Sequence, residues 1–378
     1  MKKKILFVVN VDWFFASHRM DLGKAALREG YEVHIATTVT ENKIICNQEG
    51  FIVHDIYMKR SSINPFHIFR YFLDLIKTIN LIRPNIVHLI TIKPVLIGGL
   101  ALKFCNVPAV VFAISGMGYV FIGKKTYHKF LRYVSSIIYR LALNHSNSIV
   151  ICQNKDDQNL VKNLTNLPYS KFILIKGSGV DINKFSYSKL PSTIPIVMFP
   201  SRILVDKGVM EFIEAAKLTV NSTSFNLPAR FVVVGMVDTE NQASLKLSDL
   251  MELEKNKIIE YWGHKNNMEK ILPQSSIIVL PSYREGLPKV LSEAAACGRP
   301  IITTNVPGCR EVIENNISGL LVPAKDSKKL SEAIMKLLLD RDLSSSFGKA
   351  GRRYAEKNFA IEKIILQHLE IYKSLFNV

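Results

Sequence analysis

The sequence is poor in acidic side chains and has no paired pattern of cysteines. Its 378 residues hold 32 Asp and Glu against 49 Lys and Arg, a net charge of +17. Such an excess indicates an anionic partner, such as a phosphate, a nucleic acid or an acidic membrane surface. The five cysteines are odd in number and show no C-x-x-C spacing, so neither a disulfide framework nor a zinc site is expected. This cysteine usage fits a reducing, cytoplasmic setting.

Long apolar runs are also absent. After Met1-Lys2-Lys3-Lys4, the apolar run from Ile5 to Val9 is five residues long, and no small-residue cleavage pattern follows it. We therefore interpret this segment as a first β-strand and not as an export signal. The longest uncharged stretch, Phe104 to Gly123, is interrupted by Pro108 and Gly116, which favours a buried strand and loop over a membrane span.

The sequence lacks the common nucleotide fingerprints. No G-x-G-x-x-G follows the first strand, and in its nearest imitation, Gly116-Met117-Gly118, Phe121 takes the place of the third glycine. No Walker sequence is present, so neither a nicotinamide enzyme nor a P-loop is expected. The one Asp-x-Asp, Asp340-Arg341-Asp342, joins two charged helical patterns and is interpreted as a solvated turn, so no divalent metal is expected.

Short β-branched runs alternate with amphipathic helical patterns along the whole chain. Continuously apolar strands separated by helices are typical of parallel sheets covered on both faces, the doubly wound α/β architecture. Glycine and proline punctuation between 177 and 195 interrupts this alternation near mid-chain. The sequence therefore predicts two Rossmann-like domains, residues 1–180 and 191–360, that face a central cleft. Strands are expected at 5–9, 32–36, 86–90, 109–113, 148–152, 171–175, 196–200, 230–234, 258–261, 277–280 and 300–303, and helices at 17–29, 66–81, 125–143, 207–220, 288–297, 327–339, 343–356 and 361–376.

The most informative segment runs from residue 281 to residue 294. It follows a predicted strand, bends at Gly286 and starts a helix with Pro288 in the first helical position. The backbone N–H groups near the bend and the positive end of the helix dipole would form an anion site. Glu285 sits beside that site, and Glu293 lies about a turn and a half along the predicted helix. These carboxylates could accept hydrogen bonds from sugar hydroxyls that flank a phosphate.

A second segment, Ser201 to Gly208, directly follows another predicted strand. Arg202 and Lys207 in this segment combine a fork-shaped guanidinium with a mobile ammonium, which suits a diphosphate. Either motif alone has an ordinary explanation as solvated surface. Their joint placement at strand ends favours a binding site, and a nucleotide is the expected ligand.

Together these motifs resemble the GT4 family of retaining glycosyltransferases, which have the two-domain GT-B fold. The resemblance implies that Arg202 and Lys207 bind the diphosphate of the donor, that Glu285 contacts the donor sugar, and that Glu293 contacts the ribose. It also implies a C-terminal helix, residues 361–378, that crosses back onto the first domain. The other residues expected in the donor site are Gly286, Leu287 and Pro288.

Two segments of the first domain indicate a particular group within the family. They are Phe7 to Arg19 and Ile114 to Phe121. They are similar to bacterial enzymes that extend undecaprenyl-diphosphate-linked sugars in O-antigen, lipopolysaccharide, capsule or N-glycan assembly. The resemblance implies a UDP-sugar co-substrate, with GalNAc or GlcNAc as the sugar and an α-1,3 linkage, and no cofactor. Many family members have a sugar-contacting His where this chain has Ser115; His88 is either its substitute or a structural histidine.

The acceptor site is expected at the start of the first helix. Ser17 is interpreted as the N-cap of that helix, which would direct backbone N–H groups, the imidazole of His18 and the guanidinium of Arg19 toward the diphosphate of a lipid-linked acceptor. Gly116 completes the predicted acceptor site. The alternative is that His18 and Arg19 only decorate an exposed first turn.

The basic charge is concentrated in the first half of the chain. Lys and Arg exceed Asp and Glu by 13 in residues 1–180 and by 4 in the remainder. Between Lys59 and Arg140 the only acid is Asp74, and aromatic side chains are interleaved with the basic ones. This composition predicts peripheral docking on the anionic inner face of the cell membrane. A solubilising basic face is the alternative, and a nucleic-acid module is not recognisable. The apolar and aromatic residues concerned are Phe66, Ile68, Phe69, Tyr71, Phe72 and Tyr133.

Two other functions stay open at this point. A UDP-sugar 2-epimerase shares the two-domain architecture and needs no lipid acceptor, although the Glu285 and Glu293 pair argues against it. A non-enzymatic, two-lobed sugar-binding protein of the periplasm would require an export signal, which the N-terminal segment does not resemble. Activity that depends on a polyprenyl-diphosphate sugar would separate the glycosyltransferase from both.

Overall fold

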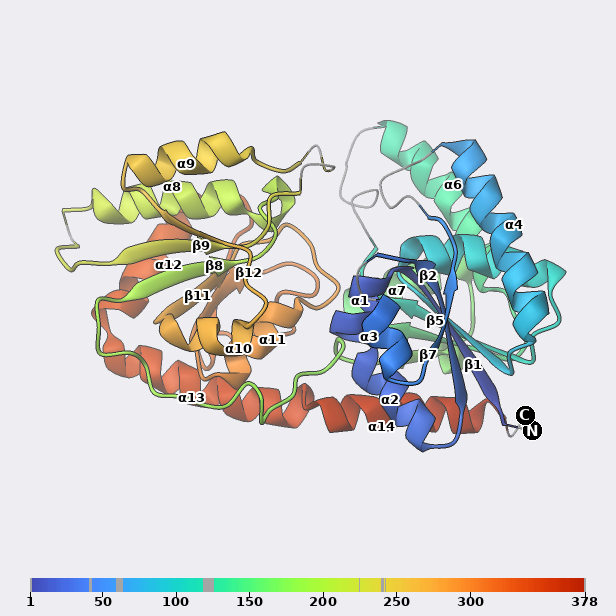
Figure 1. Cartoon of the computed structure of the whole chain (residues 1–378). Helices are drawn as coiled ribbons and strands as arrows, with labels where there is room; N and C mark the ends of the chain where they lie inside the picture. The colour runs from blue at the N-terminus through green and yellow to red at the C-terminus, as the bar shows by residue number, and fades with distance from the viewer. Residues whose placement is uncertain are drawn as a thin grey trace. The chain divides into compact units, whose positions relative to one another are not determined.

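The computed structural model describes residues 2–40, 43–58, 64–117, 126–223, 225–238, 241 and 243–376, without the side chains of 43–45 and 126–133. The chain divides into two compact units (Figure 1). Unit 1 consists of Met1–Ser178 and Glu362–Val378, and unit 2 consists of Gly179–Ile361. Residues 179–190 belong to unit 2; of these, 179 and 180 were predicted in the first domain and 181–190 between the two. Val180 forms a β-bridge with Ala360, and Phe185 is buried in the unit 2 core.

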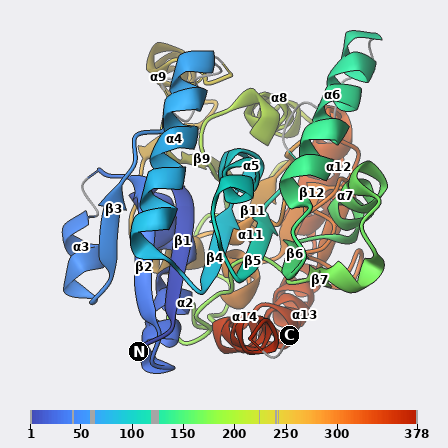
Figure 2. The ribbon, with the colours of Figure 1, turned by 90° about the vertical axis from the view of Figure 1, so that its right-hand side faces the viewer.

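Unit 1 is built on a parallel sheet with the strand order β3-β2-β1-β4-β5-β6-β7 (Figure 2). Its central strands are apolar on both faces because helices cover both: Leu6 and Val8 belong to one core, Ile5 and Phe7 to the other. The strands are β1 Lys4–Val11, β2 Glu32–Thr38, β3 Ile52–Asp55, β4 Ile86–Ile90, β5 Ala109–Ile114, β6 Ser148–Cys152 and β7 Phe172–Leu174. The helices are α1 Asp12–His18, α2 Met20–Arg28, α3 Lys43–Gln48, α4 Pro65–Ile82, α5 Gly99–Ala101, α6 Thr126–Leu143, α7 Lys155–Thr165 and α14 Ile361–Ser374, with a π-helix at Pro94–Gly98 and short 3₁₀ turns at Leu102–Phe104 and Tyr169–Lys171.

Unit 2 has a second parallel sheet, ordered β10-β9-β8-β11-β12-β13. A single core of buried residues from all these strands and their helices fills it, with Phe199 and Phe212 among the largest members. The strands are β8 Ile196–Pro200, β9 Arg230–Val234, β10 Glu260–Gly263, β11 Ile277–Leu280, β12 Ile301–Thr304 and β13 Gly319–Val322. The helices are α8 Val209–Val220, α9 Leu247–Lys255, α10 Met268–Ile271, α11 Lys289–Ala296, α12 Ser327–Leu339 and α13 Arg341–Asn358, with 3₁₀ turns at Val205–Lys207 and Leu272–Gln274.

The two sheets confirm the predicted doubly wound α/β architecture. The sequence interpretation missed β3 and β13, which are the outer strands of their sheets. β3 is exposed at both ends and β13 has only four residues, so neither carries the long buried run that marked the inner strands. The expected helix over 17–29 is wrong at its start, because α1 already begins at Asp12 and a break at Arg19 separates it from α2.

The closing helix α14 packs within unit 1. Ile364 and Leu369 belong to the core on one face of the unit 1 sheet. Tyr372 is fully buried, and its hydroxyl oxygen lies 2.7 Å from His88 Nδ1. Lys373 forms an ion pair of 2.7 Å with Glu29. The last helix of the chain therefore completes the domain that the first residues begin.

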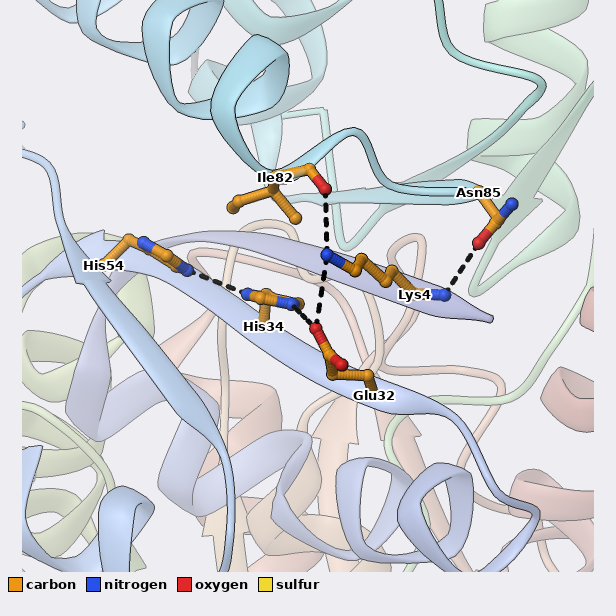
Figure 3. Close-up of polar contacts among 6 residues, drawn as sticks. All are labelled: Lys4, Glu32, His34, His54, Ile82 and Asn85. Atoms are coloured by element: carbon orange, nitrogen blue, oxygen red, sulfur yellow. Dashed lines mark hydrogen bonds and ion pairs between the residues drawn. The ribbon is translucent and has the colours of Figure 1, made fainter. Parts of the chain in front are cut away.

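A polar network ties the amino-terminal ends of β1 and β2 to their neighbours (Figure 3). Lys4 contacts the carbonyl of Ile82 at 3.4 Å and Glu32 at 3.4 Å, and its backbone N–H donates to Asn85 at 2.8 Å. Glu32 is 2.8 Å from His34 Nε2, and His34 Nδ1 is 2.9 Å from His54 Nε2. The hydrogen bond from His34 lowers the pKa of Glu32. This network links strands of the unit 1 sheet to the end of α4.

Candidate functional site

The strand order of unit 2 places two loops at one point of the sheet. β8 and β11 are neighbours at the centre, but the chain continues from β8 toward β9 and from β11 toward β12 on the other side. Ligands of open α/β sheets bind at such a switch point, outside the carboxyl ends of the strands. The loops that follow β8 and β11 are the two motif segments of the sequence, and the Tyr283 N–H donates to the Asp206 carbonyl at 2.9 Å between them.

Lys207 and Glu285, predicted from separate motifs, form an ion pair of 2.5 Å across these loops. Both side chains are largely buried, 17% and 12% exposed. The Ser282 hydroxyl donates to the same Glu285 oxygen at 2.8 Å. A ligand anion could take the Lys207 ammonium, and a ligand hydroxyl could donate to the Glu285 carboxylate. Both would compete with the Lys207–Glu285 ion pair, so a ligand that carries an anion and a hydroxyl fits this position.

The backbone around Glu285 is held from two sides. The Glu285 N–H donates to the Pro307 carbonyl at 3.1 Å. Gly308 has a φ of +80°, and a Cβ added there would meet the carbonyl oxygens of Glu285 and Gly286 at clashing distance. Gly308 is therefore glycine for two reasons, a left-handed backbone and the close approach of the loop that carries Glu285.

Arg202 is placed by the same loop as Lys207. Its Nη1 lies 3.1 Å from Asp238 Oδ2, and 40% of its side chain is exposed. Asp238 is nearly buried and follows the end of β9, the strand next to β8. The guanidinium is held at the edge of the sheet with part of its fork accessible, as bidentate recognition of a phosphate requires.

Helix α11 begins at Lys289, one residue later than predicted, with Pro288 as its N-cap. Pro288 makes no side-chain cap hydrogen bond, and the start of this helix carries backbone N–H donors and the positive end of the helix dipole. Leu287 is buried just before it. Glu293 is also buried, 3.4 Å from Lys289 Nζ, and burial raises its pKa while Lys289 opposes the rise.

The predicted acceptor residues in unit 1 are arranged differently from the expectation. Ser17 lies in the last turn of α1, where its hydroxyl donates to the Trp13 carbonyl at 2.8 Å, so its interpretation as the N-cap of the first helix is wrong. His18 stacks on Phe14 with ring centroids 4.3 Å apart. The helix begins at Asp12 because the Asp12 carboxylate accepts from the Trp13 N–H at 2.8 Å at the start of the first turn.

Arg19 is buried, which fits neither its expected place at the start of the first helix, open to a diphosphate, nor the alternative of an exposed turn. It is 4% exposed, and burial lowers its pKa to about 10. Its Nη1 donates to the His18 carbonyl at 3.1 Å. Electrostatic coupling to Tyr372 and His368 places it beside the inner side of α14. His88 is the third residue of β4 and is fully buried, with its Nδ1 2.7 Å from the Tyr372 hydroxyl.

Comparisons with known proteins agree with the geometry of unit 2. The family described as Glycosyl transferases group 1 matches residues 181–354, and Glycosyl transferase 4-like matches residues 4–154. This chain is a GT4-like glycosyltransferase. The Glu285, Lys207 and Arg202 constellation lies inside the first match, and the acceptor residues predicted near the first strand lie inside the second.

Two curated relatives of this glycosyltransferase are named for a sugar acceptor on undecaprenol diphosphate and for capsular polysaccharide biosynthesis. It is 29% identical over 344 residues, 88% of each chain, to N,N'-diacetylbacillosaminyl-diphospho-undecaprenol alpha-1,3-N-acetylgalactosaminyltransferase of Campylobacter jejuni. It is 28% identical to the capsular polysaccharide biosynthesis glycosyltransferase CapM of Staphylococcus aureus, over 93% of this chain and 90% of that one. Among solved structures, Anabaena Alr3699/HepE in complex with UDP and glucose has a TM-score of 0.78 at 17% identity, covering 98% and 100% of the two chains, which supports the GT-B fold.

Sequence reasoning missed three side chains of the glycosyltransferase near this site, two of which contact predicted residues. Ser282 holds Glu285, Asp238 holds Arg202, and Glu211 accepts from the Tyr283 hydroxyl at 2.6 Å. Ser282 directly precedes the bend that was recognised, so its position alone could have suggested the contact. Asp238 and Glu211 lie on other elements, and no spacing in the sequence links them to the motifs.

Other expectations concern metal, membrane spans and the glycine-rich segment. Among the described residues, no group of His, Cys, Asp or Glu has the arrangement of a metal site. Asp340 accepts from the Leu343 N–H at 2.8 Å as the N-cap of α13. No helix in the described ranges is both long and apolar enough to cross a bilayer. Gly116 follows β5 with a φ of +120°, whereas Gly118 to Phe121 lie outside the described residues.

Proposed function

We propose that this glycosyltransferase moves a sugar from a UDP-sugar to a saccharide linked to undecaprenyl diphosphate, during assembly of a surface polysaccharide such as O-antigen or capsule. GalNAc or GlcNAc is the proposed sugar and α-1,3 the proposed linkage. The names of the relatives support both the lipid carrier and the surface-glycan context. A UDP donor is supported by the UDP complex of the structural neighbour.

The buried ion pair of Lys207 with Glu285 is the observation that carries this proposal. A diphosphate bound at the switch point would take Lys207 and Arg202 as its cations and the start of α11 as its backbone donors. Glu285, relieved of Lys207, would accept a hydrogen bond from a hydroxyl of the donor sugar. Glu293, further along α11, is the proposed contact of the ribose.

The same groups would lower the barrier to transfer. As the bond between sugar and diphosphate breaks, negative charge develops on the leaving diphosphate, and fixed cations and helix donors stabilise that charge. The incoming acceptor hydroxyl would attack from the face that the diphosphate leaves, so the configuration of the sugar is retained. This account gives no role to a divalent metal.

A panel of radiolabelled UDP-sugars with a synthetic undecaprenyl-diphosphate-linked sugar tests the function directly. We expect transfer from one or a few UDP-sugars only when the lipid-linked acceptor is present, with an α-linked product and undiminished rates in EDTA. Acceptor-independent conversion of UDP-GlcNAc would indicate an epimerase instead. A β-linked product, or activity lost in EDTA and restored by Mn²⁺ or Mg²⁺, would contradict the mechanism.

We also propose that helix α4 docks unit 1 on the anionic inner face of the membrane, where the acceptor lies. Phe66, Phe69 and Leu73 follow one another along one side of α4 and are exposed, Phe66 by 83%. Arg70 is 71% exposed between them. Tyr71, which the sequence placed in the same group, is buried and belongs to the core, so it has no part in docking. Of the basic stretch, residues 59–63 and the side chains of 118–133 lie outside the described residues.

Vesicle sedimentation measures this docking. Binding should rise with the fraction of anionic lipid and fall with salt, because exposed charges are screened within about 8 to 10 Å at moderate ionic strength. A Phe66→Ser, Phe69→Ser double variant should bind less, whereas Leu366→Ser, an equally apolar change at an exposed position of α14, should bind as the unmodified protein does. Equal binding to neutral and anionic vesicles would contradict docking by α4 and favour the alternative, a basic face that only keeps the protein in solution.

A further inference from the structure

Tyr283 joins the two motif loops of unit 2 by its backbone and by its side chain. Its N–H donates at 2.9 Å to the carbonyl of Asp206, which directly precedes Lys207 in the loop after β8. Its hydroxyl donates at 2.6 Å to Oε1 of Glu211, which lies in the first turn of α8, where the same loop ends. One residue of the loop after β11 therefore holds the loop after β8 on both sides of Lys207.

The hydrogen bond between Tyr283 and Glu211 is of a strong kind. A hydroxyl that donates to a carboxylate forms a charge-assisted bond, and the distance of 2.6 Å is typical of one. Burial raises the pKa of Tyr283, and the hydrogen bond to Glu211 raises it further, so the phenol remains a donor. In the described part of the chain, Tyr283 is the only hydrogen-bond partner of the Glu211 carboxylate.

The second oxygen of Glu211, Oε2, is buried and has no hydrogen-bond partner among the described residues. Buried oxygens without such a partner also lie at the carboxyl edge of the unit 1 sheet, on Asn10 and Thr91, but their groups are uncharged. A half-satisfied carboxylate destabilises the folded state more than a neutral group does. Packing alone would favour an apolar side chain at residue 211, which indicates a role for the bond to Tyr283 beyond packing.

The two loops also approach each other through their backbones. Gly208 has a φ of +79°, and a Cβ added there would meet the carbonyl oxygen of Pro281 at clashing distance. The ring of Tyr283 has a further contact, because Lys325 Nζ lies 4.6 Å from its centroid, within the range of a cation–π interaction. The loop after β11 is therefore fixed against the loop after β8 around Tyr283.

The ion pair of Lys207 with Glu285 spans the same two loops, but the proposed function requires it to open. When the diphosphate takes Lys207 and a sugar hydroxyl takes Glu285, the contact of 2.5 Å between these side chains is lost. The bonds from Tyr283 to Asp206 and Glu211 use no group of the proposed donor site, so they persist. With the donor bound, Tyr283 is the link that keeps the two loops at a fixed separation.

We infer that Tyr283 and Glu211 are positioning residues of the donor site, whose hydrogen bond holds Lys207 and Glu285 at the separation that the donor requires. This inference rests on the proposed function, because it takes Lys207 and Glu285 to contact the donor. Neither Tyr283 nor Glu211 touches the donor in this account. Loss of their bond should therefore weaken donor binding and leave acceptor binding unchanged.

Variants of the pair separate positioning from folding. Tyr283→Phe leaves the Glu211 carboxylate without its donor, so this variant should melt at a lower temperature. A double variant, Tyr283→Phe with Glu211→Leu, removes both polar partners and should melt close to the unmodified protein, because such a paired replacement is nearly neutral. Tyr354→Phe is the matched control, since its hydroxyl donates to the Glu311 carbonyl at 3.2 Å elsewhere in unit 2.

Calorimetric titration with UDP and steady-state kinetics give the decisive readout. In the double variant, the Kd of UDP should rise about tenfold and kcat/KM for the UDP-sugar should fall by a similar factor, because a charge-assisted bond is lost. The KM of the acceptor should not change. Glu211→Gln can still accept from Tyr283 and should lose less, and Tyr354→Phe should bind UDP as the unmodified protein does. Unchanged UDP affinity and kinetics in the double variant would overturn the inference.

Glu211→Leu alone distinguishes positioning from direct contact with the donor. This variant keeps the Tyr283 hydroxyl, so a Tyr283 that touched the donor would still bind it. We expect Glu211→Leu to weaken UDP binding as the double variant does. UDP affinity that falls in Tyr283→Phe but is normal in Glu211→Leu would overturn the positioning role.

The binding measurement keeps the inference testable if the proposed function fails. If the protein transfers no sugar from any UDP-sugar, titrations with GDP, ADP and dTDP replace those with UDP, because Lys207 would still meet a diphosphate. The nucleotide that binds should bind more weakly to the double variant and equally well to Tyr354→Phe. Equal affinity in all variants overturns the inference alone. Absence of binding by every nucleoside diphosphate to the unmodified protein overturns it together with the donor site.

Discussion

The carboxyl edges of the two sheets present opposite kinds of chemistry. In unit 2 the candidate residues are charged and already paired: Lys207 with Glu285, Lys289 with Glu293, and Arg202 with Asp238. In unit 1 the corresponding edge carries neutral oxygens that have no partner in the described part of the chain. Both edges are switch points of a parallel sheet, so the fold alone does not account for the contrast.

The contrast follows from how much each kind of group destabilises the folded protein when no ligand is bound. A buried charge without a partner destabilises a protein by several kcal/mol, so a diphosphate site must keep its cations on carboxylates until the ligand arrives. A buried neutral oxygen costs about 1 to 3 kcal/mol and can be left open. Pre-paired charges in one unit and open oxygens in the other therefore fit an enzyme that joins a charged donor to a neutral hydroxyl.

Among the variants proposed here, removal of the Lys207 ammonium should reduce activity most, because it removes a buried cation from the charged edge of unit 2. We expect Lys207→Ala to lower kcat/KM by about 10- to 100-fold or more, since a hydrogen bond to a charged group is worth about 1.5 to 3 kcal/mol and the diphosphate loses its buried cation. Initial rates at varied UDP-sugar measure it. Lys329→Ala, which removes an exposed ion pair on α12, is the matched control and should keep full activity. Near-normal rates in a folded Lys207→Ala protein would remove the donor assignment.

Acid should destabilise unit 1 before unit 2. Burial lowers the pKa of His88 well below its ordinary value and that of His368 to about 3. The folded state therefore binds fewer protons than the unfolded state below about pH 6.5, and stability falls as the pH falls, by about 1.4 kcal/mol per pH unit for each histidine.

Urea unfolding between pH 7 and 5 measures this dependence. His368→Phe, if it folds, should flatten the slope of unfolding free energy against pH, whereas His264→Gln, at an exposed position of unit 2, should leave the slope unchanged. A His88→Gln variant gives a second estimate of the same slope. Stability independent of pH over this range would show that neither histidine is kept neutral by burial.

Replacing the fork of Arg202 by an ammonium should have a smaller effect. Arg202→Lys keeps the charge and the pairing with Asp238 but loses bidentate geometry, so kcat/KM should fall by about tenfold, about 1.4 kcal/mol. Thermal unfolding should not change, because the Arg202 side chain is 40% exposed and its ion pair is screened by solvent. An unchanged kcat/KM would mean that Arg202 acts as a surface charge only.

The smallest effect is expected at Arg19, where the sequence predicted acceptor binding. Among the described residues no carboxylate lies within ion-pair distance of its buried guanidinium, so Arg19→Met should stabilise unit 1 by about 1 kcal/mol. The acceptor KM should stay unchanged. A raised acceptor KM with unchanged stability would restore the original assignment and weaken the contrast between the two edges.

Several features could be predicted without coordinates because they depend on neighbouring residues. A strand buried on both faces must be apolar throughout, so β1, β4, β8 and β11 were found with small errors at their ends. Gly286 and Pro288 marked the turn into α11 to within one residue. The likeness of the 285–293 and 202–207 segments to GT4 enzymes was also visible, and the family matches confirm the class.

Other features depend on which distant residues meet, and only the tertiary structure decided them. The sequence predicted Ser17 and Arg19 at the start of a helix. The helix instead begins at Asp12, so the Ser17 hydroxyl lies in its last turn and donates to the Trp13 carbonyl. Arg19 is buried, and it interacts electrostatically with Tyr372 of α14, a helix from the far end of the chain. Asp238 reaches Arg202 from another strand end, and Asn10 and Thr91 are brought to corresponding positions only by the register of β1 and β4. Local sequence determined which segments become strands and helices, because hydrophobic periodicity is a property of consecutive residues. Which polar groups are paired and which are left open was determined by packing, because that depends on residues up to hundreds of positions apart.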